Sequence, residues 1–205
     1  LPIYQTLMFN VEKAILRKDE SGSKLIITLH GQGYHYLYKG TYEQAVANGD
    51  KRENWIAGEQ VNGLWQFTIP VSEGEDCIPV VAISNSYLTK YEQGKNTLER
   101  AFYPRQLKIN EAEMSLTSGD YDHVKDLTVS NSVKMFNVNA ASLHTIGGPN
   151  SNNYQEILHL TMGSDSFDKI FIGSADDAAK AETTTAITDR KADLVVKANT
   201  MGGGT

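Results

Sequence analysis

The stretch KLIITLHGQGYHYLYKGTYEQAVAN, residues 24–48, decides the fold because the chain carries it twice. The second copy is ILHLTMGSDSFDKIFIGSADDAAKA, residues 157–181, at a constant offset of 133 residues. A second match, MFNV at residues 8–11 and again at 135–138, has an offset of 127. Copy two therefore carries six extra residues, in the run IGGPNSNN. The repeat predicts two modules with a common fold.

Each copy begins with an alternating strand. Leu25, Ile27 and Leu29 occupy every second position, which is the period of a strand with one buried face. Copy two keeps this phase at Leu158 and Leu160. Because a slip of one residue would turn the apolar face to water, the shared phase predicts a shared core.

A short strand over residues 34–39 leads into a helix signal. Thr41 and Gln44 form a capping-box pattern, in which each side chain bonds a backbone N–H of the other residue. We expect a helix of about two turns that stops at Gly49. Ser174 begins the looser equivalent in copy two.

Further apolar runs predict more strands at residues 64–71 and 78–84, with a hairpin turn at Asn62-Gly63. Residues 85–95 are polar and indicate a loop. Near the start, the apolar phase changes between Val11 and Ala14, which predicts a β-bulge or a strand that changes sheets. Seven residues at apolar phases are expected to form one core: Leu25, Ile27, Leu29, Phe67, Ile69, Val80 and Ala82.

This density of short strands is typical of an antiparallel sandwich. We therefore predict an all-β fold with short helices, made of two tandem immunoglobulin-like antiparallel β-sandwich modules. Module one covers residues 1–110, a linker covers 111–126, and module two covers 127–205.

Module two is expected to be incomplete, because copy two stops where copy one has just finished the strand LWQFTIPV. The chain continues further, or module two is a smaller variant, or a neighbouring chain inserts a strand at the open edge. For the last alternative, residues 1–11 are the expected donor, and head-to-tail pairing would give filaments.

The composition narrows the classes of protein to which this chain can belong. The net charge of −6 gives no indication of a nucleic-acid surface, and no apolar run is long enough for a membrane span. A single cysteine excludes an intrachain disulfide. The chain begins at Leu1, so we expect a processed or excised segment. Ten tyrosines, with frequent Thr, Ser, Asn and Gly, favour a β-rich extracellular or cell-surface protein.

The run FNVEKAILRKDESGSKLIITLHGQGYHYLYKGTYEQAV, with WQFTIPVSEGEDCIPVVAIS after it, resembles a repeated β-sandwich module in surface and secreted proteins of anaerobic Firmicutes. The shared pattern is G-x-G-Y-x-x-L-Y-x-G-T-x-E-x-A followed by an F-x-I-P-V strand. Module one carries the whole pattern and module two only its first half. The resemblance implies an extracellular, non-catalytic module.

The order of strands is also similar to that of NEAT haem-binding domains, which place a Y-x-x-x-Y pair on a late strand. Tyr87 and Tyr91 have this spacing. The resemblance implies that one of them would ligate haem iron. The chain departs from the family because the flanking Asn, Ser, Gln and Gly indicate a loop at this point.

The cluster Tyr34-His35-Tyr36-Leu37-Tyr38 is the other candidate binding feature. In a regular strand its three tyrosines share one face, with His35 opposite. An exposed row of tyrosines would suit sugar, peptide or haem contact. The alternative is that Tyr34 and Tyr38 are core aromatics, since copy two has phenylalanine at both positions.

No catalytic constellation is visible. No two histidines have a helical or CxxC-like metal spacing, and no nucleophile elbow is present. Cys77 follows acidic residues and precedes a buried strand, which disfavours its thiolate. We predict no enzyme, no metal and no cofactor apart from the haem alternative.

The predicted function is a non-enzymatic extracellular or cell-surface module for adhesion, assembly or ligand binding. Its partner is a surface ligand or neighbouring copies of the chain. The candidate ligand-binding residues are Tyr34, His35, Tyr36, Tyr87 and Tyr91.

Overall fold

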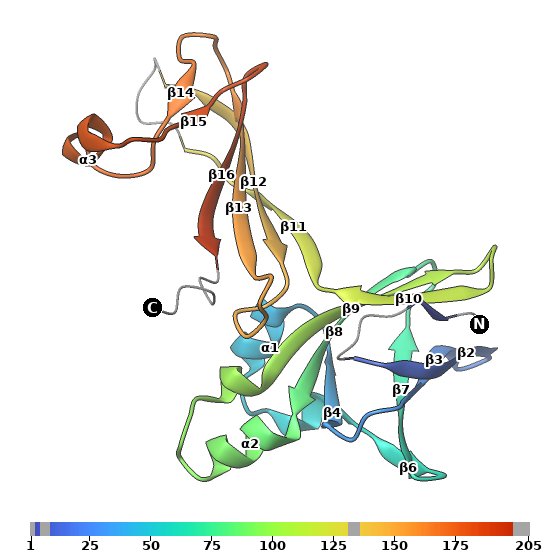
Figure 1. The fold of residues 1–205 in the computed structure, drawn as a ribbon. Helices are drawn as coiled ribbons and strands as arrows, with labels where there is room; N and C mark the ends of the chain where they lie inside the picture. Colours follow the sequence, from blue (N-terminus) through green and yellow to red (C-terminus); the bar gives the residue numbers. More distant parts are fainter. Residues whose placement is uncertain (1–2, 5–8, 131–135, 199–205) are drawn as a thin grey trace. The chain divides into compact units, whose positions relative to one another are not determined.

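The computed structural model describes residues 3–4, 9–130 and 136–198. The chain forms two compact units, drawn in Figure 1. Unit 1 is Leu1–Tyr121 with Gly147–Ser151, and unit 2 is Asp122–Ile146 with Asn152–Thr205. Antiparallel strands dominate both units and the helices are short, so the predicted all-β class is confirmed. Within the described residues, no helix is long and apolar enough to cross a membrane.

Unit 1 is a sandwich of a six-stranded and a four-stranded sheet. The strand orders are β1-β10-β9-β8-β4-β5 and β2-β3-β7-β6, and among the strands of the described residues only β1 pairs in parallel. The six-stranded sheet contains β1 (Ile3–Tyr4), β4 (Tyr34–Lys39), β5 (Trp55–Ala57), β8 (Cys77–Ser84), β9 (Phe102–Asn110) and β10 (Ser115–Asp120). The four-stranded sheet contains β2 (Val11–Asp19), β3 (Gly22–Leu29), β6 (Glu59–Val61) and β7 (Leu64–Val71).

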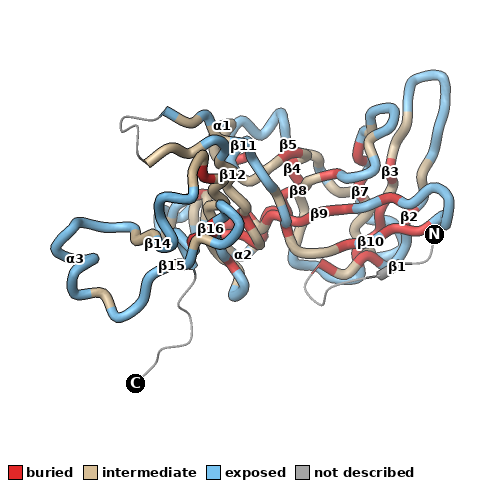
Figure 2. The backbone as a smooth tube through the Cα atoms, turned by 90° about the horizontal axis from the view of Figure 1, so that it is seen from above, coloured by how far each residue is buried: buried red, intermediate tan, exposed pale blue. Residues whose placement is uncertain are grey.

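The inner core, the buried cluster that both sheets of unit 1 supply, contains all seven residues predicted for it. Ile27 lies opposite Phe67, and Leu25 lies opposite Ile69 on the neighbouring strand. Figure 2 shows the buried positions, in red, along the strands of this unit. The alternation of apolar residues therefore gave the correct inward face of each strand.

The predicted bulge is present. The register between β2 and β3 shifts between Val11 and Lys13, so one extra residue is accommodated. As a result Val11 and Ala14, which are three positions apart, both face the inner core.

A second buried cluster, the outer cluster, covers the other face of the six-stranded sheet. The helices α1 (Tyr42–Asn48) and α2 (Asn85–Glu92) and the 3-10 turn η2 (Leu98–Ala101) contribute Ala45, Leu88 and Leu98 to it. A further 3-10 turn, η1 (Arg52–Asn54), precedes β5. Because β8 is buried on both faces, its sequence is a continuous apolar run rather than an alternation.

Helix α1 begins and ends as predicted. The Thr41 N–H donates to Gln44 Oε1 at 2.9 Å, and the Gln44 N–H donates to Thr41 Oγ1 at 3.2 Å, which completes the capping box. Gly49 follows the last helical residue with a positive φ of 54°. The capping box and Gly49 are local sequence signals, so both ends of α1 could be predicted without knowledge of tertiary contacts.

Two segments differ from expectation. Residues 85–95 were expected to be a loop, but α2 occupies most of them. Residues 111–126 were expected to be a linker, and the boundary between the two units, at Tyr121 and Asp122, falls within them, but β10 and most of β11 (Asp122–Leu127) occupy them as strands. Serine and glycine suggested turns here, yet Ser115 and Ser118 are buried in β10 because their small side chains fit against neighbouring strands.

Unit 2 contains a four-stranded sheet of order β11-β12-β13-β16 and a two-stranded sheet β14-β15. Helix α3 (Ala175–Lys180) has Ser174 as its N-cap, which accepts from the Asp177 N–H at 3.1 Å. The strands are β12 (Val138–Ile146), β13 (Gln155–Met162), β14 (Lys169–Ile170), β15 (Thr185–Ala186) and β16 (Lys191–Ala198).

The two copies of the repeated sequence also pair their strands in the same register. Ala14 lies opposite Ile27 in unit 1, and Ala141 lies opposite Leu160 at the corresponding point of unit 2. The bulge recurs as well, between Val138 and Ala140. Strands β12 and β13 are therefore the counterparts of β2 and β3.

Unit 2 shares only part of the fold of unit 1. Its described residues contain no counterpart of β8, β9 and β10, the strands that cover the equivalent face in unit 1. Leu25 and Ile27 are fully buried, whereas Leu158 and Leu160 are only half-buried. Much of unit 2 accordingly appears tan or pale blue in Figure 2.

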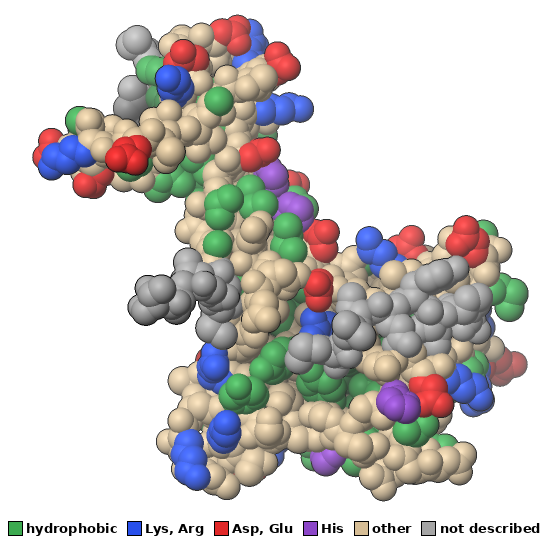
Figure 3. Space-filling view, viewed as in Figure 1, with side chains coloured by type: hydrophobic (Ala, Val, Ile, Leu, Met, Phe, Trp, Pro, Cys, Tyr) green, Lys and Arg blue, Asp and Glu red, His purple; other side chains and the backbone are tan. Residues whose placement is uncertain are grey.

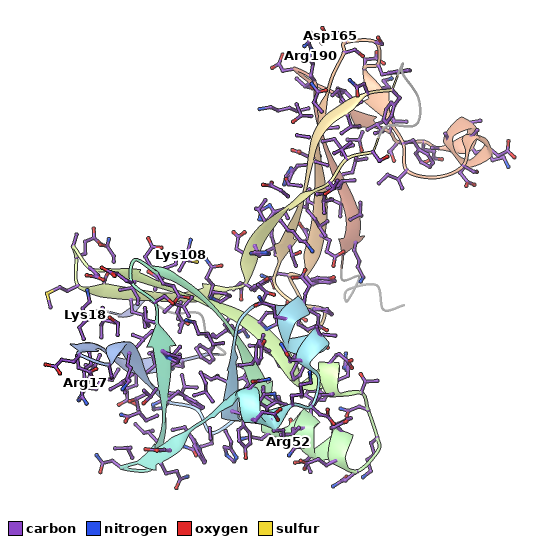
Figure 4. All side chains as sticks on the ribbon, turned by 180° about the vertical axis from the view of Figure 1, so that it is seen from behind. Arg17, Lys18, Arg52, Lys108, Asp165 and Arg190 are labelled. Atoms are coloured by element: carbon purple, nitrogen blue, oxygen red, sulfur yellow. The ribbon has the colours of Figure 1, made fainter. Side chains whose placement is uncertain are left out.

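An ion pair fixes the turn that leads into β16. Asp189 and Arg190 have positive φ values of 50° and 61°. Arg190 Nε and Nη2 donate to the two carboxylate oxygens of Asp165 at 2.7 and 2.6 Å, and Figure 4 labels both residues. These hydrogen bonds lower the pKa of Asp165.

Candidate functional site

The Tyr34 cavity, a hollow of about 560 Å³ in unit 1, contains one of the predicted ligand-binding residues. The end of β3, the loop that follows it, and the junction of β8 with α2 form its walls. The lining residues are Asn10, Leu29, His30, Gly31, Gln32, Gly33, Tyr34, Ser84, Asn85 and Ser86.

A bulge in β4 separates the tyrosines that were expected to share one face. The register of β4 against β8 shifts between Tyr34 and Tyr36. Tyr34 packs against the inner core, whereas Tyr36 and Tyr38 pack in the outer cluster. The prediction of a continuous tyrosine row is therefore wrong, because an extra residue changes the phase of the strand. Tyr38 is a core aromatic, as the alternative interpretation held.

Tyr34 is held by two neighbouring rings. Its ring centroid lies 6.0 Å from that of Phe9 and 6.4 Å from that of Tyr103. Tyr103 in turn lies 6.3 Å from Tyr87, so it links two of the predicted residues. Burial, and then the neighbouring Tyr87 and Tyr34, raise the pKa of Tyr103, so the Tyr103 phenol is neutral near pH 7.

His35 supports the wall of the cavity through Trp65 without lining the cavity itself. Its ring stacks on Trp65 with centroids 4.0 Å apart. Trp65 Nε1 donates to Gln32 Oε1 at 2.8 Å, and Gln32 Nε2 donates to the Gly63 carbonyl at 3.0 Å. His35 does not line the cavity, and its contact supports the loop that does.

Asn85 is the residue that sequence reasoning missed. Its Oδ1 accepts from the His35 N–H at 2.9 Å, and its Nδ2 donates to the Gln32 carbonyl at 2.9 Å. Its own N–H donates to the Gly33 carbonyl at 2.9 Å. Asn85 therefore joins the start of α2 to both sides of the loop, and the only signal for it was an asparagine after an apolar strand.

Tyr87 and Tyr91 lie on α2, one turn apart, and pack against the outer cluster. Neither residue lines the Tyr34 cavity. Lys90 Nζ lies 4.8 Å from the Tyr87 ring centroid, and the Arg100 guanidinium lies 5.5 Å from it. The structure thus groups Tyr34 with His35 and Asn85 at the cavity. Tyr87 is connected to Tyr34 through Tyr103, and Lys90 and Arg100 lie beside the Tyr87 ring.

The lining of the Tyr34 cavity presents hydroxyl, amide and aromatic groups. Ser84 Oγ and Ser86 Oγ are 3.2 Å apart, so they can share a hydrogen bond. His30, whose Nδ1 lies 3.3 Å from Glu12 Oε2, is the one histidine in the lining. Among the described residues, the lining contains no lysine, arginine or carboxylate, so it suits an uncharged polar ligand.

Two other cavities lie elsewhere in unit 1. One of about 830 Å³ contains Cys77 and Lys108, and one of about 430 Å³ contains Leu16 and Val71; Glu75 and Glu111 line both. Neither contains a predicted ligand-binding residue. Across residues 3–4, 9–130 and 136–198, no group of three or more His, Cys, Asp or Glu is placed to hold a metal ion.

Comparisons with protein-family models, curated proteins and solved structures find no match to this chain. Functional inference therefore rests on the geometry of the two units.

Proposed function

We propose that this chain is a non-enzymatic binding module of an extracellular or cell-surface protein, and that its ligand is an uncharged, hydroxyl-rich molecule such as a carbohydrate. The observation that carries the proposal is the Tyr34 cavity, in which an aromatic ring lies beside serine hydroxyls and no strongly charged group. Aromatic rings bind the apolar face of a sugar, while hydroxyl and amide groups bind its hydroxyls.

The cavity is held in shape before any ligand arrives. Asn85 and Gln32 bond to backbone groups on both sides of the loop, and Trp65 anchors Gln32. Ordering a flexible loop on binding costs free energy, so a loop that is already bonded favours affinity. Ser86 is exposed and lines the same cavity, so its hydroxyl can contact a ligand.

The extracellular location is supported by composition and by the resemblance to surface-protein modules. The chain has ten tyrosines and a single cysteine, and it carries no strong positive charge. Antibody labelling of intact and permeabilised source cells tests the location. Labelling of intact cells is the expected result, and labelling only after permeabilisation would contradict it.

A glycan array, followed by calorimetry with the full chain, tests the ligand. Tyr34→Leu and Ser86→Ala should each weaken binding, by about 10-fold for loss of the aromatic contact. Tyr36→Leu is the matched control, because it removes a half-buried ring from the other face of β4. Absence of any carbohydrate binding, or binding that neither Tyr34→Leu nor Ser86→Ala weakens, would overturn the proposal.

Haem capture at α2 is a second candidate, favoured by one observation. Lys90 and Arg100 lie beside the Tyr87 ring, where they could pair with the carboxylates of a haem. Tyr87 or Tyr91 would then supply the phenolate ligand to iron. Haemin titration separates this candidate from the carbohydrate proposal, because Tyr87 and Tyr91 do not line the Tyr34 cavity.

A further inference from the structure

A row of four titratable side chains crosses the whole four-stranded sheet of unit 2. Asp122, His144, His159 and Asp193 come from β11, β12, β13 and β16 in turn. His144 Nε2 lies 2.6 Å from Asp122 Oδ1, and His159 Nδ1 lies 2.6 Å from Asp193 Oδ1. Between the rings, His159 Nε2 lies 3.4 Å from His144 Nδ1. Figure 3 shows histidine side chains beside acidic ones on this unit.

The hydrogen bonds fix which nitrogen of each ring is available. A carboxylate only accepts, so each histidine donates an N–H to its aspartate, from Nε2 in His144 and from Nδ1 in His159. In a neutral imidazole the other nitrogen carries a lone pair. The lone pairs of His144 Nδ1 and His159 Nε2 therefore face each other, and no proton lies between them unless one ring becomes charged.

The spacing of these two nitrogens fits a tetrahedral metal ion. Zinc–nitrogen distances of about 2.0–2.1 Å at a tetrahedral angle place two ligand nitrogens about 3.4 Å apart. The separation here is 3.4 Å. Adjacent corners of a square-planar copper site would be closer, about 2.8–3.0 Å apart at the same bond lengths.

The aspartates complete the arrangement that zinc-binding histidines generally have. A ligating histidine donates its other ring N–H to a carboxylate or carbonyl, which fixes the tautomer and the ring orientation. Both histidines have such a carboxylate partner. We propose that His144 and His159 bind one zinc ion, with Asp122 and Asp193 as positioning residues and water at the remaining positions.

Both histidine rings are partly exposed to solvent. The His144 and His159 side chains are 22% and 36% exposed, so the rings are held but their edges reach solvent. Val124 lies opposite His144 and Ser142 lies opposite His159 on the adjacent strands, and neither adds a competing charge.

Unit 1 provides an internal control. Arg17 and Ile26 occupy the positions of β2 and β3 that correspond to His144 and His159. An arginine and an isoleucine cannot bind zinc, so the proposal assigns the site to unit 2 alone. It is independent of the ligand of the Tyr34 cavity.

Calorimetry with zinc chloride on the full chain is the first measurement. One ion per chain is expected, and His144→Ala and His159→Ala should each weaken binding at least about 10-fold. His123→Ala is the matched control, since it removes a histidine of β11 on the strand face opposite to Asp122 and should leave zinc binding unchanged. Asp122→Asn and Asp193→Asn should weaken binding by about 10–100-fold, the range typical of such supporting carboxylates.

Cobalt chloride gives a structural readout. Tetrahedral cobalt has strong visible absorbance, which should appear in the wild type and vanish in His144→Ala. Imidazole nitrogen NMR should show zinc shifting His144 Nδ1 and His159 Nε2 while the aspartate-bonded nitrogens keep their protons. Absence of zinc binding to the wild type, or binding that both alanine variants retain, would overturn the site and leave the pair as an ordinary hydrogen bond.

Discussion

Gly40 and Gly173 hold the same backbone conformation at the same point of the two copies, with φ of 143° and 152°. In each copy an aromatic ring two residues earlier folds back over the glycine. A Cβ on Gly40 would lie 2.7 Å from Tyr38 Cε1, and one on Gly173 would lie 2.5 Å from Phe171 Cε1. The glycine lets the strand turn into the helix without displacing this ring.

Gly40→Ala should therefore destabilise unit 1 by about 1–3 kcal/mol, because both the positive φ and the contact with Tyr38 oppose a side chain. Urea unfolding followed by tryptophan fluorescence measures the change. Gly31→Ala is the control, since a Cβ there meets nothing within 4 Å. Equal effects of the two substitutions would contradict the role assigned to Gly40.

Much of the fold could be predicted because its signals are local. The phase of Leu25 and Ile27 gave the inner core, and the Thr41 capping box gave the start of α1. Helix α2 was missed because its polar sequence buries one residue, Leu88, and so has no apolar stripe. Strand β10 was missed because its buried serines look like turn residues.

The sites depend on register, which sequence spacing does not reveal. His144 and His159 are 15 residues apart in the sequence, which is not a spacing typical of metal ligands on a helix. The pairing of β12 with β13 nevertheless brings their ring centroids to within 5.5 Å of each other. The bulge in β4 likewise moved Tyr34 away from Tyr36. A histidine on each of two strands predicted to pair is the signal that would have pointed to the first of these arrangements.

Glu75 should make stability depend on pH. Burial alone raises its pKa, but hydrogen bonds from Lys39 and Ser72 outweigh burial and lower the pKa below the ordinary 4.5. Lys39 Nζ lies 2.7 Å from Glu75 Oε2. Since the folded pKa is the lower one, the stabilisation is present above pH 4.5 and is lost as pH falls through the folded value.

Glu75→Gln should thus cost on the order of 1 kcal/mol at neutral pH, and the difference from wild type should shrink below about pH 4.5. Urea unfolding across this range measures it. Glu73→Gln, at an exposed neighbouring position, is the control. A difference that does not change on acidification would show that the lost charge is not responsible.

The haem candidate makes a spectroscopic prediction. Titration with haemin should give a shifted Soret band in the wild type, because a tyrosinate ligand changes the iron environment. The double variant Tyr87→Phe with Tyr91→Phe keeps both rings in the outer cluster and removes both phenol oxygens, so the shift should disappear. Tyr34→Phe is the control. The absence of a shift in the wild type, or an equal shift in the double variant, removes haem as a ligand.

Strand addition by a second copy of the chain is the remaining alternative for unit 2. The predicted donor, residues 1–11, lies partly outside the described residues, at 1–2 and 5–8. The described part contains Ile3–Tyr4, which forms the short strand β1 against β10, and residues 9–11, in which Phe9 and Val11 are fully buried in the inner core. Donation of the whole segment would therefore uncover Phe9 and Val11, and this cost opposes strand addition by residues 1–11.

A matched pair of substitutions distinguishes a covered from an uncovered unit 2. Ile27→Ala should cost about 2–5 kcal/mol, because Ile27 is fully buried in the inner core. Leu160→Ala, at the repeat-equivalent position, should cost about 1 kcal/mol or less in the monomer, because Leu160 is only half-buried. If copies complete the sandwich, light scattering should show assembly with rising concentration, and the cost of Leu160→Ala should rise with it. A compact monomer at all concentrations, with a small and constant cost at Leu160, would exclude strand addition and leave unit 2 as a smaller variant of unit 1.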